Sequence, residues 1–176
     1  GVEDLVTALD DLARRGYNAK LLVVGGGAGA SDPTNRQYLQ RVRGLIAERG
    51  LDARVTWTGY LPPEEASAAL AAVDVCVLPY RDGASFRRGS LMAALAHGLP
   101  IVTTHPRVPV PELAHGRAVW LVPPEDPAAL ADGIARLADD GSLARSLAVG
   151  AADLARAFDW QRIAARTLEV LHGVTP

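Results

Sequence analysis

Apolar and polar positions along the chain follow two patterns, one typical of helices and one typical of strands. Residues 2–12 repeat apolar side chains at helical spacing, which predicts an amphipathic helix. Short aliphatic runs bounded by glycine, proline or polar turns predict strands at 20–24, 54–58, 75–78, 101–104 and 117–122. Further helices are predicted at 33–49, at 63–72, from Gly89 and Ser90 onward, and at 127–139, 142–157 and 160–172.

The order of these elements predicts an α/β fold with a Rossmann-like parallel sheet, because most strands are followed by a helix that can cross back over the sheet. Helices should cover both faces of the sheet, and three helices follow at the carboxyl-terminal end. The runs 75–78 and 101–104, next to Pro79 and Pro100, are apolar enough to be buried on both faces. At 176 residues, the chain fits one domain spanning 1–176.

Ligands of such sheets bind beyond the carboxyl ends of the strands, so three turns are expected to meet at one rim. These turns are residues 25–29, 59–61 and 79–90. In the last of them, Arg87 and Arg88 precede a helix start, where backbone amides without partners favour an anion. A helix start contributes only about 0.3–1 kcal/mol toward an exposed anion, so a tightly bound diphosphate also needs an arginine.

Residues 25–30, GGGAGA, match the G-x-G-x-x-A spacing of a dinucleotide fingerprint. That fingerprint also requires a helix that begins inside the motif and an acidic residue about 20 residues later, at the end of the next strand. Here Pro33 delays the helix, and Glu48 lies near the end of the helix. A dinucleotide-dependent oxidoreductase and a plain glycine turn therefore stay open as alternatives.

Several residues with versatile side chains are expected to have structural roles. Cys76 lies inside a predicted strand, where a thiol usually packs in the core. Asp74, just before it, is typical of a turn or a cap. No histidine has a carboxylate or serine at an interval that indicates catalysis. The other residues expected to pack or to stabilise helix ends and loops are Trp57, Trp120, Trp160, His97, His105 and His115.

The composition removes several classes of function. An apolar fraction of 49% allows a core, and a net charge of −2 with a pI near 6.1 indicates neither nucleic acid nor an anionic membrane as partner. No apolar run is long enough for a membrane span. One cysteine cannot form an internal disulfide, and four scattered histidines offer no metal-ligand spacing. We expect a cytoplasmic protein, and because Gly1 directly opens a helix we expect the chain to begin inside a larger protein.

Seven segments cover nearly the whole chain in a characteristic order: LLVVGGG, RVTWTGYLPPEE, AAVDVCVLPY, ALAHGLPIVTT, PEL, LVPPEDPAALADGIARLADD and FDWQRIA. Together they resemble the carboxyl-terminal domain of GT-B glycosyltransferases, in particular the retaining group 1, or family-four, enzymes. The resemblance implies that this half binds a nucleotide-diphosphate sugar, and that a missing amino-terminal half binds the acceptor and could attach the enzyme peripherally to a membrane. It implies no metal, no cofactor besides the donor substrate, and no activity of the isolated half.

The resemblance also implies roles for particular residues. The glycines after the first strand would pass near the diphosphate, and the second turn would meet the base mainly through its backbone. The third turn would offer amides to the phosphates and the sugar. The residues in these positions are Gly25, Gly26, Gly27, Gly59, Tyr60, Leu61, Phe86, Arg87, Arg88, Gly89 and Ser90.

The sequence departs from this family where its members usually carry two glutamates, the second of which binds the ribose hydroxyls. Ser85 and Ala93 occupy those positions. Asp82 could replace the first glutamate, but no obvious residue replaces the second. Loss of a hydrogen bond to a charged group weakens binding by about 1.5–3 kcal/mol, or roughly ten- to a hundred-fold. A degenerate, non-catalytic sugar-nucleotide-binding module is therefore the alternative function.

Overall fold

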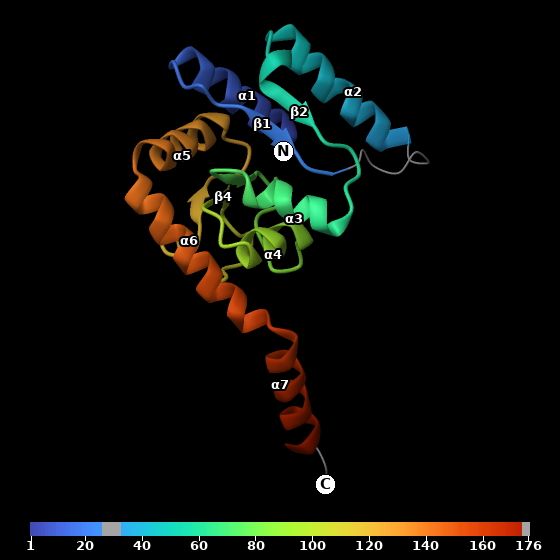
Figure 1. Ribbon diagram of the computed structural model, residues 1–176, viewed down its shortest axis with the longest axis vertical. Coiled ribbons are helices and arrows are strands. Elements are labelled where there is room, and N and C mark those ends of the chain that lie inside the picture. The colour runs from blue at the N-terminus through green and yellow to red at the C-terminus, as the bar shows by residue number, and fades with distance from the viewer. Residues whose placement is uncertain (26–32, 174–176) are drawn as a thin grey trace.

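The computed structural model describes residues 1–25 and 33–173 (Figure 1). Every helix and strand expected from the sequence is present, with ends that move by at most a few residues, and two unexpected 3-10 helices lie at Asp52–Arg54 and Arg156–Phe158. The strands are β1 (Leu21–Val23), β2 (Val55–Trp57), β3 (Cys76–Leu78), β4 (Ile101–Thr104) and β5 (Trp120–Val122). The helices are α1 (Val2–Arg14), α2 (Pro33–Glu48), α3 (Pro63–Ala71), α4 (Gly89–Ala96), α5 (Pro127–Asp139), α6 (Gly141–Ala155) and α7 (Trp160–Gly173).

The strands form two parallel sheets, whereas the sequence predicted one. Strand β1 pairs with β2, with Leu21 opposite Val55. The larger sheet has the order β3-β4-β5, with Cys76 opposite Ile101 and Val102 opposite Trp120. No pairing joins β1 to β3 in the described ranges. Each strand pair extends over three residues, which is why most strands are shorter than the apolar runs that predicted them.

Burial differs between the strands. All four residues of β4 are buried, as predicted for 101–104. Strand β3 is only partly buried, so the prediction that 75–78 is buried on both faces is wrong. The reason is its position in the sheet: β4 has a partner strand on each edge, whereas β3 has one on a single edge.

Helices cover both faces of the larger sheet, as expected. Ile101 of β4 packs in a core cluster with Leu91 of α4 and Ala151 of α6. The next residue, Val102, packs in another cluster with α1 and with Leu130 of α5. Successive side chains of a strand point to opposite faces, so α4 and α6 lie on one face and α1 and α5 on the other.

Helix α1 packs against both sheets. Leu5 and Leu12 join the cluster that contains residues of β4, β5 and α5. Val6 and Leu9 join a separate cluster with α2 and with partly buried residues of β1 and β2, including Leu21. The apolar positions predicted from the sequence therefore divide between two cores, and α1 holds the two sheets together.

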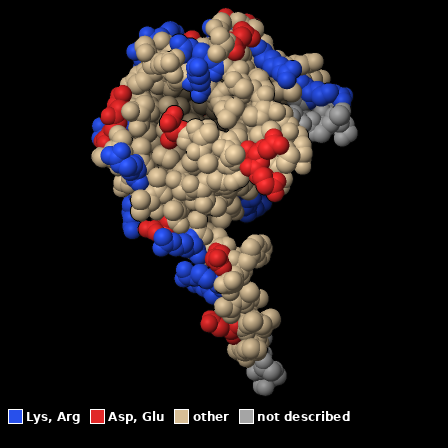
Figure 2. All heavy atoms as spheres, in the orientation of Figure 1, with Lys and Arg blue, Asp and Glu red and all other residues tan. Residues whose placement is uncertain are grey.

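Helix α7 extends away from the rest of the chain, at the end opposite α1 and α2 (Figure 1), and projects from it in the space-filling view as well (Figure 2). None of its residues is buried. Trp160 is 82% exposed, so the expectation that it packs in the core is wrong, whereas Trp57 and Trp120 are partly buried against core clusters. Leu168 and Leu171 are also exposed. Among residues 1–25 and 33–173, no helix has the length and apolar character needed to cross a bilayer.

Candidate functional site

Two of the three predicted turns meet directly at the carboxyl ends of β1 and β2. Gly25 and Gly59 form an isolated antiparallel bridge, and the Gly25 amide donates a hydrogen bond to Thr58 Oγ1 at 3.1 Å. Both glycines have positive φ, 124° and 68°, a conformation that a side chain would strain. Tyr60 beyond them is 82% exposed. At this turn pair the two glycines present backbone, and Tyr60 adds one exposed aromatic side chain.

Two of the predicted glycines, Gly26 and Gly27, lie outside the described residues. No hydrogen bond or ion pair within 1–25 and 33–173 joins the Gly25 turn to the loop after β3. The start of α1 does reach that loop, because Gly1 packs so closely on the Pro79 carbonyl that a Cβ atom on Gly1 would lie 1.7 Å from it.

The loop after β3 is held in place by two buried threonines of β4. Thr103 Oγ1 donates to the Leu78 carbonyl and Thr104 Oγ1 donates to the Tyr80 carbonyl, each at 2.7 Å. At Gly83 the loop packs closely on the segment after β4, because a Cβ atom at this position would lie 2.6 Å from the His105 carbonyl oxygen. From the sequence, these threonines were predicted only as strand residues. Their position at the carboxyl end of a buried strand was the one available signal.

Four side chains of this loop and of α4 form a polar cluster. Arg88 is ion-paired with Asp82, and its guanidinium lies 4.9 Å from the centre of the Tyr80 ring. The Tyr80 hydroxyl is 2.6 Å from Ser90 Oγ. Burial raises the pKa of the Tyr80 hydroxyl, so this group stays protonated at neutral pH. Arg88 is therefore oriented in advance, and its charge is partly neutralised by Asp82.

Arg87, which precedes Arg88, differs from it in having no charged partner among the described residues. Its side chain is exposed, and it makes no ion pair or hydrogen bond with the described residues. Helix α4 begins directly after Arg88 without a side-chain cap, and Gly89 and Ser90 are exposed. The Leu91 amide contacts the Tyr80 hydroxyl, whereas the exposed residues Gly89 and Ser90 lie directly after Arg87 and Arg88, so an anion could reach this helix start beside the Arg87 guanidinium.

Two other candidate residues have mainly structural contacts. Phe86 packs its ring against Phe158, with ring centres 4.5 Å apart, and stays partly exposed. The Ser85 carbonyl accepts a hydrogen bond from the Arg88 amide at 3.1 Å, which closes the turn before α4. Neither side chain supplies a charge to the site.

A cavity of about 510 Å³ opens at the carboxyl ends of β3, β4 and β5. Arg81 lies on one side of it and forms ion pairs with Glu3 and Asp4 of α1 and with Glu125. The hydrogen bond from Arg81 to Asp4 raises the pKa of this arginine further. Glu125 has φ 57°, which is strained for a residue other than glycine. The cavity is lined by Arg81, Asp82, Gly83, His105, Pro106, Arg107 and Pro124.

His97 and His115 make hydrogen-bond contacts within the fold, in agreement with the structural roles expected for them. His97 contacts Ser67 Oγ through Nε2 and the Ala93 carbonyl through Nδ1, each at 2.8 Å. His115 Nδ1 accepts a hydrogen bond from the Leu121 amide. No group of three or more potential metal ligands occurs in the part of the chain that is described. Both histidines therefore have structural contacts in this fold.

Residues 1–140 match the family model described as glycosyl transferases group 1. The chain belongs to this family. A GDP-mannose-dependent alpha-(1-6)-phosphatidylinositol monomannoside mannosyltransferase of Mycobacterium tuberculosis is 30% identical to this chain over 181 residues, which cover 98% of this chain and 44% of the relative.

Solved structures show the same similarity. Sucrose-phosphate synthase from Thermosynechococcus elongatus superposes with a TM-score of 0.84 at 28% identity, covering 99% of this chain and 42% of that chain. HepE from Anabaena, crystallised in complex with UDP, superposes with a TM-score of 0.84 at 21% identity, covering 99% of this chain and 45% of that chain. The chain thus spans less than half the length of each of these three proteins.

These similarities assign the fold to the carboxyl-terminal domains of GT-B glycosyltransferases. They also remove the dinucleotide-dependent oxidoreductase from the alternatives. In this chain Ser85 and Ala93 stand where the resemblance expects glutamates, and the nearest replacement, Asp82, is already paired with Arg88.

Proposed function

We propose that this chain is the donor-nucleotide half of a retaining glycosyltransferase that moves a sugar from a nucleotide-diphosphate sugar to an acceptor held by an amino-terminal half. The observation that carries the proposal is the exposed Arg87, which has no ion pair or hydrogen bond among the described residues, next to the exposed first residues of α4. The diphosphate would lie on these amides, and the base would lie on the backbone at Gly25 and Gly59. HepE binding UDP and the mycobacterial relative using GDP-mannose support a nucleoside diphosphate, but they differ in base.

In such a transfer the bond between the sugar carbon and the diphosphate oxygen breaks, and negative charge grows on the departing diphosphate. Arg87 and the first amides of α4 would stabilise that charge. The helix start contributes about 0.3–1 kcal/mol when exposed, and a charged hydrogen bond contributes about 1.5–3 kcal/mol. The guanidinium is therefore the larger contribution, and no general base on this half is required for it.

The length of the relatives and the exposed apolar and strand-edge surfaces of this chain support the existence of a second, amino-terminal half of the protein. The relatives are more than twice as long as the share that this chain covers. Helix α7 exposes Trp160, Leu168 and Leu171, and β1 and β3 each have an edge without a partner strand among the described residues. A further strand and an acceptor domain would cover these surfaces. On this proposal the isolated chain binds donor nucleotide weakly and transfers no sugar.

The second candidate is a degenerate module that binds sugar nucleotides without transferring sugar. Ser85 and Ala93 favour it, because neither supplies a carboxylate to the ribose or the sugar. Asp82 does not restore the missing charge while it neutralises Arg88.

Calorimetric titration of the full-length protein with UDP, GDP, ADP and NAD tests both candidates. Saturable binding of one nucleoside diphosphate, together with transfer of radiolabelled sugar to an endogenous acceptor extract, supports the transferase. Binding without transfer supports the degenerate module. Binding of none of the four ligands refutes a donor site at the rim.

A further inference from the structure

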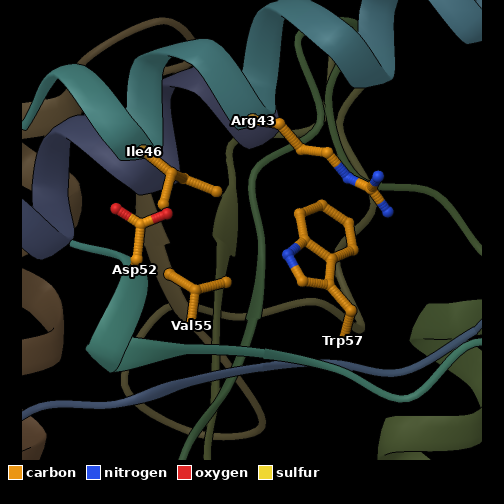
Figure 3. A pocket seen from close by; sticks show the side chains of 5 residues that line it. All are labelled: Arg43, Ile46, Asp52, Val55 and Trp57. Atoms are coloured by element: carbon orange, nitrogen blue, oxygen red, sulfur yellow. The ribbon is translucent and has the colours of Figure 1, made fainter. Parts of the chain in front are cut away.

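A second hollow, of about 200 Å³, lies between α2 and the outer edge of β2, and none of its lining residues belongs to the Arg87 loop. Its lining consists of Arg43, Ile46, Asp52, Val55 and Trp57. In Figure 3, Asp52, Ile46 and Val55 stand on one side of an open space, and the Trp57 indole with the Arg43 guanidinium beside it stands on the other. Ordinary small-molecule pockets measure roughly 300–1,000 Å³, so this hollow has room for one small ring.

The lining combines an aromatic surface with two opposite charges that do not neutralise each other. The Arg43 guanidinium carbon lies 5.5 Å from the centre of the Trp57 ring. Arg43 and Asp52 form no ion pair with each other or with any other residue in 1–25 and 33–173, and both side chains are exposed. Ile46 is buried and Val55 is partly buried, so the floor between the two charges is aliphatic.

These features select the chemistry of the occupant. An anion would meet the Asp52 carboxylate, and a cation would meet the Arg43 guanidinium. A purely apolar ring would remove water from both charges without replacing its hydrogen bonds. A neutral ring with hydroxyl groups meets these requirements, because it donates to the carboxylate, accepts from the guanidinium and can place C–H groups against the part of the indole that Arg43 leaves uncovered.

We propose that this hollow binds a single neutral pyranose unit, at a site separate from the donor nucleotide. The site stands on its own lining and does not depend on the transferase activity. Exposed polar contacts and one stacking surface give weak binding, so the dissociation constant for a monosaccharide should be millimolar.

The test uses the indole N–H signal of Trp57 in ¹⁵N–¹H NMR spectra of the protein, assigned with Trp57→Phe and Trp160→Phe. Methyl α-glucopyranoside and methyl α-mannopyranoside are the probes, with glucuronate and glucosamine as charged comparators. The expected result is saturable movement of the Trp57 signal with at least one neutral glycoside, and weaker binding of both charged sugars.

Asp52→Asn and Arg43→Gln should each weaken this binding several-fold, and both side chains are exposed enough to leave the fold intact. Glu48→Gln and Arg41→Gln are the controls, because each removes one negative or one positive charge from a residue of α2 that does not line the hollow. Both variants should bind the glycosides like the unmodified protein. No saturable shift with either neutral glycoside overturns the proposal. Tighter binding of a charged sugar, or equal binding by all four variants, also overturns it.

Discussion

Replacing Asp82 by asparagine separates two roles that this carboxylate could have in the rim. In the structure Asp82 is ion-paired with Arg88, and its side chain is 65% exposed while that of Arg88 is 36% exposed. If Asp82 competes with the phosphates for Arg88, the Asp82→Asn protein binds nucleoside diphosphate more tightly. If Asp82 instead replaces the missing glutamate and holds a hydroxyl of the donor, the same change weakens binding. The sign of the effect therefore identifies the role.

We expect tighter binding, because the carboxylate already has its partner within its own loop. An exposed ion pair is worth about 0.2–1 kcal/mol, and its release before phosphate binding should tighten the dissociation constant roughly 1.4- to 5-fold. Isothermal calorimetry of full-length protein with UDP and GDP measures this change. Asp74→Asn is the matched control, because Asp74 is exposed, precedes β3 and lies at the opposite end of that strand. A tenfold loss of affinity in Asp82→Asn, with the control unchanged, would refute the competition and assign Asp82 to the donor.

Three other changes test the site and its supports. Arg87→Ala should weaken nucleoside diphosphate binding by about 1.5–3 kcal/mol in calorimetry, whereas Arg145→Ala on α6 should not; equal affinity in both variants contradicts a phosphate role for Arg87. Thr104→Val should lower the free energy of unfolding in urea by about 1 kcal/mol, because it removes the hydrogen bond to the Tyr80 carbonyl, and the same change at exposed Thr167 should cost much less. Burial raises the pKa of Cys76 to about 11, so at pH 9 the folded thiol is ionised in about one molecule in a hundred and should react slowly with Ellman's reagent. Because the neutral thiol is favoured in the folded state, its contribution to stability should fall as the pH rises from the ordinary value of 9.0 toward 11; rapid labelling of folded protein at pH 9 would contradict this.

Local signals in the sequence were sufficient for the order and type of the elements. Asp126, followed by Pro127, predicted the start of α5, and the Asp126 carboxylate does accept a hydrogen bond from the Ala129 amide at 2.9 Å. The run 101–104 was correct to the residue, because its four apolar or β-branched residues are all buried between two partner strands. Such elements depend on caps and periodicity, which are contained within a few neighbouring residues.

The site could be predicted only in part, because its properties depend on contacts distant in the chain. The meeting of Gly25 with Gly59 followed from the rule that strand ends share a rim. The sequence could not distinguish Arg87 from Arg88, because the difference comes from the Asp82 carboxylate and the Tyr80 ring. The pairing of Arg81 with acidic residues of α1 was missed for the same reason, since 77 residues separate Arg81 from Asp4.

The two failed burial predictions have a common cause. The run 75–78 and Trp160 have the apolar character of core residues, yet β3 is only partly buried and Trp160 is largely exposed. Apolar segments are normally covered by other parts of a protein. Within the described residues, β3 has one edge without a partner strand and α7 has no buried residue, so both are incompletely covered. On the proposed two-domain arrangement both surfaces are covered by the other half. Joining that half should therefore protect the amides of β3 and α7 from hydrogen exchange more than those of β4, which already has both of its partner strands.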